Sequence, residues 1–295
     1  MGCFHFVGRI KLMIMTDEQK TILDKLENNF DVLWSEFCQF IPEAKEIIAR
    51  REIAKFGKKY AKRYKLLLDS RQDLIKSPCL LDEFVSSLGN EGHNPEFCKE
   101  VKMITETIQL ALSNAKSFNR NSIVKGVKDT LKQMIITLDL DNAANNPDYR
   151  NRLNELLVFN WLCECKNLKI TDIAYPLGNG KDCDFRCIHK DGTELLIEVV
   201  SIQNIDLSKQ DNANTFSKFI NKKVETKFKD KTKELRDIPN LKILPILDYV
   251  NGIVELAPTL DPAISFPAFT VVMNTLYGNN EILLTTIDSL ISNQK

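Results

Sequence analysis

The hydrophobic pattern of the chain changes about halfway along, and this change limits the folds open to it. From Thr16 to about Leu140, apolar residues recur at spacings of three and four, which predicts helices over about 17–40, 43–68, 71–88, 95–117 and 121–138. After a polar segment at 141–147, one apolar helix at about 148–166 precedes short β-rich runs at 169–175, 183–189 and 194–202. A lysine-rich helix at about 209–236 and a buried strand at 241–247 follow. This order predicts a mixed α/β fold, with helices packed on a small mixed central sheet.

The polar segment also predicts the domain boundary. Asn146 is suited to cap a helix, and Pro147 to occupy its first position. We expect an all-helical domain over 15–141 and an α/β domain over 147–295, with residues 1–14 as an N-terminal extension. Beyond Gly252 three prolines interrupt the pattern, so 269–273 and 282–287 are either further strands or a closing helix.

Composition and charge exclude several classes of protein. With 40 basic and 40 acidic side chains the chain has no net charge, so contact with nucleic acid needs a local basic patch. The longest apolar run, at 156–163, is far shorter than the roughly 20 residues that span a bilayer, and we expect no membrane partner. The eight cysteines form no Cys-X-X-Cys pair and indicate a reducing compartment, the cytoplasm. The three histidines lack the spacing of zinc ligands.

Two acidic residues stand within otherwise apolar strands, Asp184 in the second and Glu198 in the third. An ionised carboxylate in such a place costs several kcal/mol unless a cation or a hydrogen-bond donor pairs with it. Both residues therefore require a compensating group. This requirement makes them the leading candidates for a functional site.

The turn between these two strands decides whether the two acids meet. A tight two-residue turn would put Asp184 opposite Val199, with Glu198 on the other face. A three-residue loop with Gly192 in the left-handed conformation would instead put Asp184 opposite Glu198. Opposed side chains have Cβ atoms about 5 Å apart, so the two carboxylates would repel unless they shared a cation such as Mg²⁺.

This arrangement resembles the PD-(D/E)XK nuclease superfamily, in which a helix precedes a hairpin that carries an aspartate and then a Glu-X-Lys. The resemblance covers about 147–250 and rests on three stretches: 154–157 (Asn-Glu-Leu-Leu), 180–185 (Gly-Lys-Asp-Cys-Asp-Phe) and 197–200 (Ile-Glu-Val-Val). It implies a restriction-endonuclease-like fold and metal-dependent hydrolysis of nucleic acid, with DNA as the expected substrate. It also implies that Asp184 and Glu198 hold Mg²⁺ or Mn²⁺, with help from Glu155. Many such nucleases are dimers, so a homodimer is compatible with it.

The chain departs from that family at Val200, which stands where the motif lysine would be. In parts of the superfamily a neighbouring element supplies the lysine, and here the next helix offers Lys223 and Lys227, which share one face at four-residue spacing. If neither reaches the site, the domain would bind nucleic acid or a protein without cutting. An accidental likeness to the family, on an unrelated α/β fold, is the third alternative.

Each acidic candidate also has a plainer structural interpretation. Asp184 would accept hydrogen bonds from turn amides at Gly180 or Lys181. Glu198 would face water from an edge strand. Glu155 would only be favoured by the helix dipole in the first turns of its helix.

A second candidate region is the basic segment 50–65, which holds eight basic residues and one acidic residue. Phe56, Tyr60 and Tyr64 recur within it every four residues. The helix could follow a nucleic-acid backbone through its basic side chains, of which we select Arg51, Lys55, Lys58, Lys59 and Lys62. Alternatively, the aromatic residues belong to the core and the lysines form an ordinary solvated face.

Overall fold

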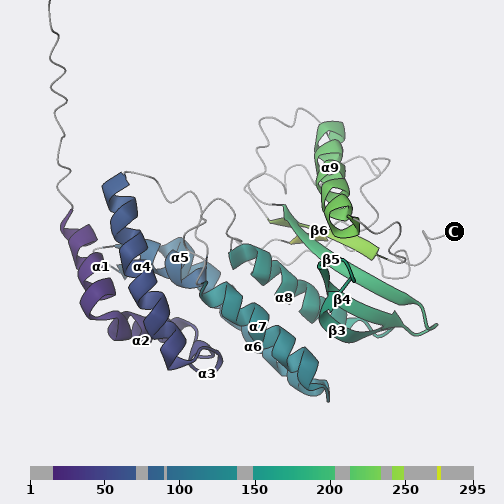
Figure 1. The fold of residues 1–295 in the computed structure, drawn as a ribbon, viewed down its shortest axis with the longest axis horizontal. Coiled ribbons are helices and arrows are strands. Elements are labelled where there is room, and N and C mark those ends of the chain that lie inside the picture. Colours follow the sequence, from purple (N-terminus) through teal and green to yellow (C-terminus); the bar gives the residue numbers. More distant parts are fainter. Residues whose placement is uncertain are drawn as a thin grey trace, which may run out of the picture.

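The computed structural model describes residues 16–70, 79–89, 92–137, 149–202, 213–233, 241–248 and 271–273. Figure 1 shows a helical part followed by a sheet part along the chain. The expected extension at 1–14, the boundary segment at 141–147 and the run at 282–287 lie outside the described residues. None of the helices in the described ranges is long and apolar enough to cross a bilayer.

The helical part consists of seven described helices and one short hairpin. The helices are α1 (Asp17–Asn28), α2 (Phe30–Phe40), α3 (Ala44–Ile47), α4 (Arg50–Ser70), α5 (Leu80–Ser86), α6 (Pro95–Ser117) and α7 (Asn121–Ile135). The hairpin pairs β1 (Leu88–Gly89) with β2 (Gly92–His93). The sequence pattern did not predict this hairpin, because two-residue strands are too short to show an alternation of polar and apolar residues.

Two of the predicted helices are interrupted. The helix expected over 17–40 is divided at Asn29, whose φ of −131° and ψ of 32° lie outside the helical range. The helix expected over 43–68 is divided at Ile48, which is extended. In both cases the apolar spacing continues across the break, so periodicity alone gave one long helix.

The sheet part is a mixed α/β unit. Its helices are α8 (Tyr149–Glu164) and α9 (Ala213–Thr232), and its strands are β3 (Leu168–Pro176), β4 (Asp182–His189), β5 (Glu194–Ile202), β6 (Leu241–Asp248) and β7 (Val271–Met273). The strand order follows the chain: β3, β4 and β5 are antiparallel neighbours, while β6 and β7 continue the sheet in parallel. The predicted mixed α/β class is confirmed.

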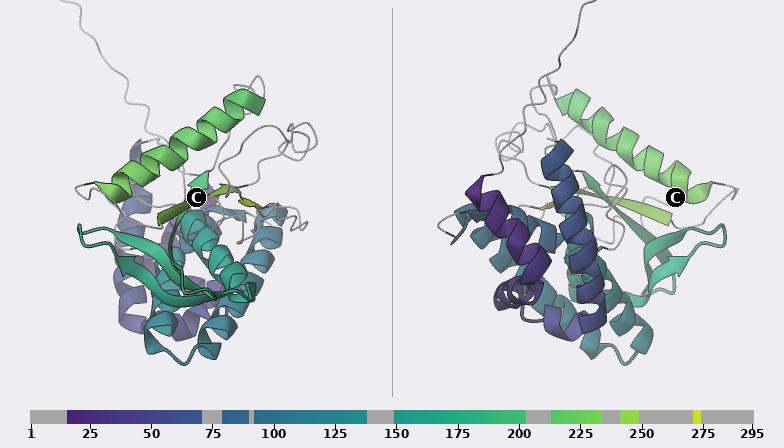
Figure 2. Two further views of the ribbon diagram at one scale, coloured as in Figure 1. Left: turned by 90° about the vertical axis from the view of Figure 1, so that its right-hand side faces the viewer. Right: turned by 60° about the vertical axis from the view of Figure 1, so that its left-hand side comes forward.

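Alternate residues of β5 face different helices. Leu195, Ile197 and Val199 belong to the large core that includes α8. Leu196 and Val200 belong to a smaller cluster with Val224 of α9. Helix α9 accordingly lies across β5 and β6 (Figure 2), and β5 is covered on both faces, as its continuous apolar run predicts.

The helical part and the sheet part share one hydrophobic core. The large cluster runs without a break from α1 to β5, and α8 packs against both α6 and α7. Helix α7 also contacts β3 at Gly126, where an added Cβ atom would lie 2.8 Å from the Cβ of Ile173. This close approach brings α7 to the edge of the region where Asp184 lies.

The hairpin between β4 and β5 has the three-residue loop, the second of the two alternatives that the sequence left open. The N–H of His189 donates to the carbonyl of Thr193 at 2.8 Å, and Gly192 has a φ of +89°. The regular ladder runs from Ile188 opposite Glu194 to Phe185 opposite Ile197. The next pair in this register is Asp184 and Glu198.

We predict that Gly192→Ala lowers the free energy of unfolding by about 1 to 2 kcal/mol. The added Cβ atom meets nothing within 4 Å, so the cost comes from the left-handed backbone alone. Gly192→Asn is the control, because asparagine tolerates this conformation and should recover part of the loss. Urea unfolding measures both variants. Equal losses in the two variants would contradict the assignment of the loop.

Candidate active site

A cavity of about 290 Å³ lies where α8, β4, β5 and α9 meet. Its charged lining consists of four acidic and three basic side chains: Glu155, Asp182, Asp184, Glu198, Arg152, Lys227 and Lys231. The structure therefore brings together Asp184, Glu198, Glu155 and Lys227, four of the residues that the sequence selected.

Glu198 occupies the centre of this arrangement. Its side chain is only 2% exposed, and two lysines of α9 bind it: Lys227 Nζ lies 2.8 Å from Oε1 and Lys231 Nζ lies 3.0 Å from Oε2. The interpretation of Glu198 as a water-facing residue of an edge strand is wrong, because β5 lies between β4 and β6. Two cations compensate the buried carboxylate, as its apolar strand requires.

Lys231 is the more deeply placed of the two lysines. Its side chain is 9% exposed, whereas that of Lys227 is 33% exposed. Lys231 also donates to the backbone carbonyl of Asp182, so it joins α9 to both β4 and β5. Burial opposes its positive charge, but the charges of Glu198, Asp184 and Asp182 together outweigh burial, and the pKa of Lys231 lies above its usual value.

The regular pairing of β4 with β5 ends at Asp184, where a side-chain oxygen accepts the hydrogen bond from β5. The N–H of Val199 donates to Asp184 Oδ2 at 2.6 Å. The donor to this oxygen is therefore Val199, and not the turn amide of Gly180 or Lys181 that the plainer interpretation expected. Burial, and then the negative charges of Glu155 and Glu198, hold the pKa of Asp184 well above its usual value, although the Val199 bond opposes the shift.

Glu155 approaches the same cavity from α8. Its two oxygens accept hydrogen bonds from Arg152 Nη1 at 2.7 and 2.9 Å. Burial raises the pKa of Glu155, Arg152 lowers it, and Glu198 raises it further. Its side chain is 15% exposed and faces the site, so the helix dipole is not its only role.

Helix α9 supplies two lysines to the site, and one of them was not predicted. Lys223, which we expected together with Lys227, is exposed, with its Nζ 5.6 Å from the centre of the Phe219 ring. Lys231 takes the place beside Lys227. The four-residue spacing that selected Lys223 and Lys227 continues to Lys231 and could have identified it. Val200 contributes only packing, in the small cluster with Val224.

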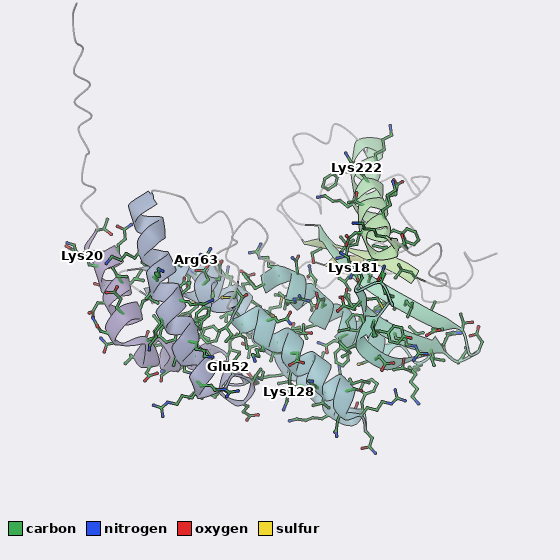
Figure 3. The ribbon with its side chains drawn as sticks, in the orientation of Figure 1. Lys20, Glu52, Arg63, Lys128, Lys181 and Lys222 are labelled. Atoms are coloured by element: carbon green, nitrogen blue, oxygen red, sulfur yellow. The ribbon has the colours of Figure 1, made fainter. Side chains whose placement is uncertain are left out.

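The basic segment 50–65 lies on α4, and its aromatic stripe is part of the core. Phe56, Tyr60 and Tyr64 are buried, so the second interpretation of this stripe is correct. The selected basic side chains are all exposed: Arg51, Lys55, Lys58, Lys59 and Lys62. Figure 3 draws the side chains of α4 and labels Glu52 and Arg63 among them. Their exposure fits either a solvated face or a surface for a polyanion.

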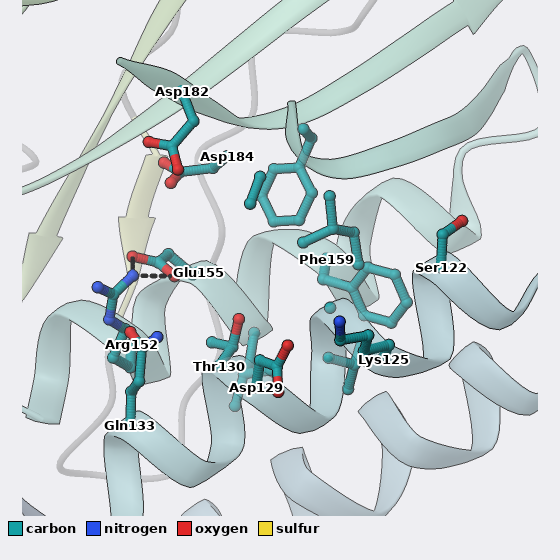
Figure 4. Close-up of a pocket in the computed structure, with 16 residues that line it drawn as sticks. Ser122, Lys125, Asp129, Thr130, Gln133, Arg152, Glu155, Phe159, Asp182 and Asp184 are labelled. Atoms are coloured by element: carbon teal, nitrogen blue, oxygen red, sulfur yellow. Dashed lines mark hydrogen bonds and ion pairs between the residues drawn. The ribbon is translucent and has the colours of Figure 1, made fainter. Parts of the chain in front are cut away.

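A second cavity adjoins the first. It has a volume of about 400 Å³ and shares Arg152, Glu155, Asp182 and Asp184 with it. Its far wall is α7, which contributes polar side chains (Figure 4): Ser122, Lys125, Asp129, Thr130 and Gln133. The acidic cluster is therefore open on two sides.

The donor set suits a hard divalent cation, although the side chains are at present bound to protein groups. Glu155, Asp184 and Glu198 offer carboxylate oxygens, the ligands that Mg²⁺ prefers. Burial raises the pKa of Asp184, and the repulsion from Glu155 and Glu198 raises it further; a cation would relieve this repulsion. Among the described residues, no group of three or more His, Cys, Asp or Glu side chains is already arranged to hold a metal ion. Glu198 would have to exchange a lysine contact for such an ion.

We predict that Lys231→Met lowers the free energy of unfolding at neutral pH by about 3 kcal/mol, because it removes a buried partner of Glu198. Lys229→Met is the matched control on the same helix. The Lys229 side chain is 79% exposed, and its loss should change stability by no more than about 0.5 kcal/mol. Urea unfolding measures both. Equal effects of the two substitutions would show that the buried ion pair does not stabilise the fold.

Comparisons with known proteins identify no relative of this chain. No protein-family model, no curated protein and no solved structure matches it. The function is therefore argued from the side chains of the site.

Proposed function

We propose that this protein is a metal-dependent nuclease that hydrolyses phosphodiester bonds, with DNA as the expected substrate. The observation that carries this proposal is the convergence of Glu155, Asp184 and Glu198 with Lys227 on one cavity. Buried carboxylates that repel one another, next to a lysine, are a costly arrangement for stability alone. The order of these residues along α8, β4 and β5 is also that of the nuclease superfamily that the sequence resembles.

In this proposal Asp184 and Glu198 hold Mg²⁺ or Mn²⁺, with Glu155 as a third ligand. When bound, such an ion acidifies a water molecule and neutralises charge on the attacked phosphate. Lys227 is the accessible lysine, and it supplies a donor for the negative charge that develops on the phosphate oxygens. Lys231 stays buried and fixes Glu198 and β4 in position.

The exposed basic side chains of α4 are the proposed contact for the nucleic-acid backbone. Arg51, Lys55, Lys58, Lys59 and Lys62 lie on one helix, and the packing of its aromatic residues in the core fixes their orientation. A row of exposed cations on a rigid helix attracts phosphates whatever the base sequence. In this proposal the exposed face of α4 provides affinity for nucleic acid, and cleavage takes place in the acidic cavity.

The competing function is a nuclease-like module that binds nucleic acid or a protein partner without cutting. Val200 is the observation that favours it, because the strand position of the motif lysine carries an apolar side chain packed near Val224. Both functions use the same fold. Lys227 decides between them, since only the enzyme needs its charge for chemistry.

We predict that the wild-type chain cleaves plasmid or oligonucleotide DNA with Mg²⁺ or Mn²⁺, and that Asp184→Ala abolishes cleavage. Lys227→Ala should lower the rate by about 100- to 1000-fold, because it removes a donor to the developing charge. Lys223→Ala is the matched control, four residues away on the same helix, and should leave the rate nearly unchanged. Gel assays with end-labelled substrates measure the rates.

These assays separate the two functions. Cleavage that both Asp184→Ala and Lys227→Ala remove supports the enzyme. Absence of cleavage by the wild-type chain on both DNA and RNA, with either metal, supports the module. Equal activity of the Lys223 and Lys227 variants would contradict the role assigned to Lys227.

We predict that replacing Lys55, Lys58 and Lys62 together by alanine weakens DNA binding and flattens its dependence on salt. Each lost phosphate contact should lower the slope of log K against log salt by about 0.9 on duplex DNA. A Lys20→Ala variant, which removes an exposed lysine of α1 bound to Asp17, is the control. Fluorescence anisotropy at several salt concentrations measures the slope. An unchanged slope would assign α4 to an ordinary solvated surface.

A further inference from the structure

Arg152 stands at the junction of the two cavities and has no role in the scheme above. It lies on α8, one turn before Glu155, and lines both the 290 Å³ and the 400 Å³ cavity. Figure 4 shows its guanidinium directed at Glu155. Its side chain is 28% exposed, so a ligand in either cavity can reach it.

The hydrogen bonds of Arg152 leave much of its guanidinium unused. A guanidinium has five N–H donors, and the bonds to Glu155 come from Nη1 alone. Nε is enclosed by protein and has no hydrogen-bond partner among the described residues. Because Nη1 is bound to Glu155 and Nε is enclosed, Nη2 is the part of the guanidinium that a ligand in the cavities can reach.

The charges around the cavity make Arg152 the cation of the α8 wall. Lys227 and Lys231 are both bound to Glu198 on the α9 side. Arg152 lies on the opposite wall, on α8, and its Nη2 can donate to a phosphate oxygen while Nη1 stays bound to Glu155. A phosphodiester that enters beside four carboxylates requires such a fixed positive charge.

We propose that Arg152 binds a phosphate group of the nucleic-acid substrate, so that the strand lies between α8 and α9 and continues into the cavity along α7. This inference rests on the proposed function, because it assigns the ligand of the same site. Glu155 holds the guanidinium in position before the phosphate arrives. The simpler alternative is that Arg152 serves only as the counter-ion of Glu155.

The test uses the full chain and a set of fluorescein-labelled DNA oligonucleotides, each with one neutral methylphosphonate linkage. Binding is measured by anisotropy with Ca²⁺ in place of Mg²⁺, so that no chemistry is needed. One neutral linkage should weaken binding to the wild-type chain by about 10- to 100-fold. The same linkage should change the affinity of Arg152→Gln by less than about threefold, because the contact is already lost.

Two further variants exclude a general effect on folding. Arg152→Lys keeps the charge but has one nitrogen to share between Glu155 and the phosphate, and should retain part of the sensitivity to that linkage. Arg150→Gln is the matched control, because Arg150 lies two residues away on α8 and pairs with Glu100. The affinity of Arg150→Gln should depend on the position of the neutral linkage in the same way as that of the wild-type chain.

The outcomes of this test and of the cleavage assay are independent. If Arg152→Gln loses as much affinity at that linkage as the wild-type chain does, the inference is overturned, even if the wild-type chain cleaves DNA. If the loss of affinity at that linkage depends on Arg152 but no metal supports cleavage, the inference stands and the proposed enzymatic function is overturned. Failure of the wild-type chain to bind any of the oligonucleotides overturns the inference whatever the cleavage assay gives.

Discussion

The ion pairs between Glu198 and the two lysines of α9 determine how this part of the molecule is built. A carboxylate at the middle of a strand covered on both faces can remain charged only if cations reach it. Lys227 and Lys231 reach it from one helix, and Lys231 also binds β4. The position of α9 on the sheet is therefore set by charge as well as by the apolar contact of Val224. A helix placed in this way can rotate only if Glu198 loses its partners.

Charge also distinguishes the site from an ordinary buried ion pair. The first cavity has four acidic and three basic side chains in its lining, which leaves one negative charge in excess. The two lysines neutralise Glu198, and Arg152 neutralises Glu155, while the one hydrogen bond that Asp184 accepts from the described residues comes from a backbone N–H. Asp184 is thus the group with the least compensation, and it lies where both cavities meet. A divalent cation would bring the lining from one excess negative to one excess positive charge, which suits an anionic phosphate.

The sequence predicted the strands of this site better than its helices. The bounds of β5 were predicted as the structure has them, because a continuous apolar run between an Asp-Gly turn and a polar segment leaves little choice. The register between β4 and β5 stayed open in the sequence, since a two-residue Asp-Gly turn and the longer loop both need a left-handed backbone at Gly192. By contrast, nothing in the periodicity revealed the break at Asn29, and Lys223 was selected for the site whereas Lys231 was not. Which lysines of a helix reach a strand depends on the rotation of that helix, and tertiary contacts set this rotation.

Arg152 was missed for a related reason. A single arginine near the start of a helix has no pattern of its own, and its importance comes from cavities that form only when α7 and the sheet pack together. Helix α7 reaches the sheet because Gly126 permits a close approach to Ile173. The same helix forms the far wall of the second cavity, so the helical part shapes the space beside the acidic cluster. Because α7 and the sheet both line the cavity beside Arg152, a substrate strand bound at Arg152 would touch both parts.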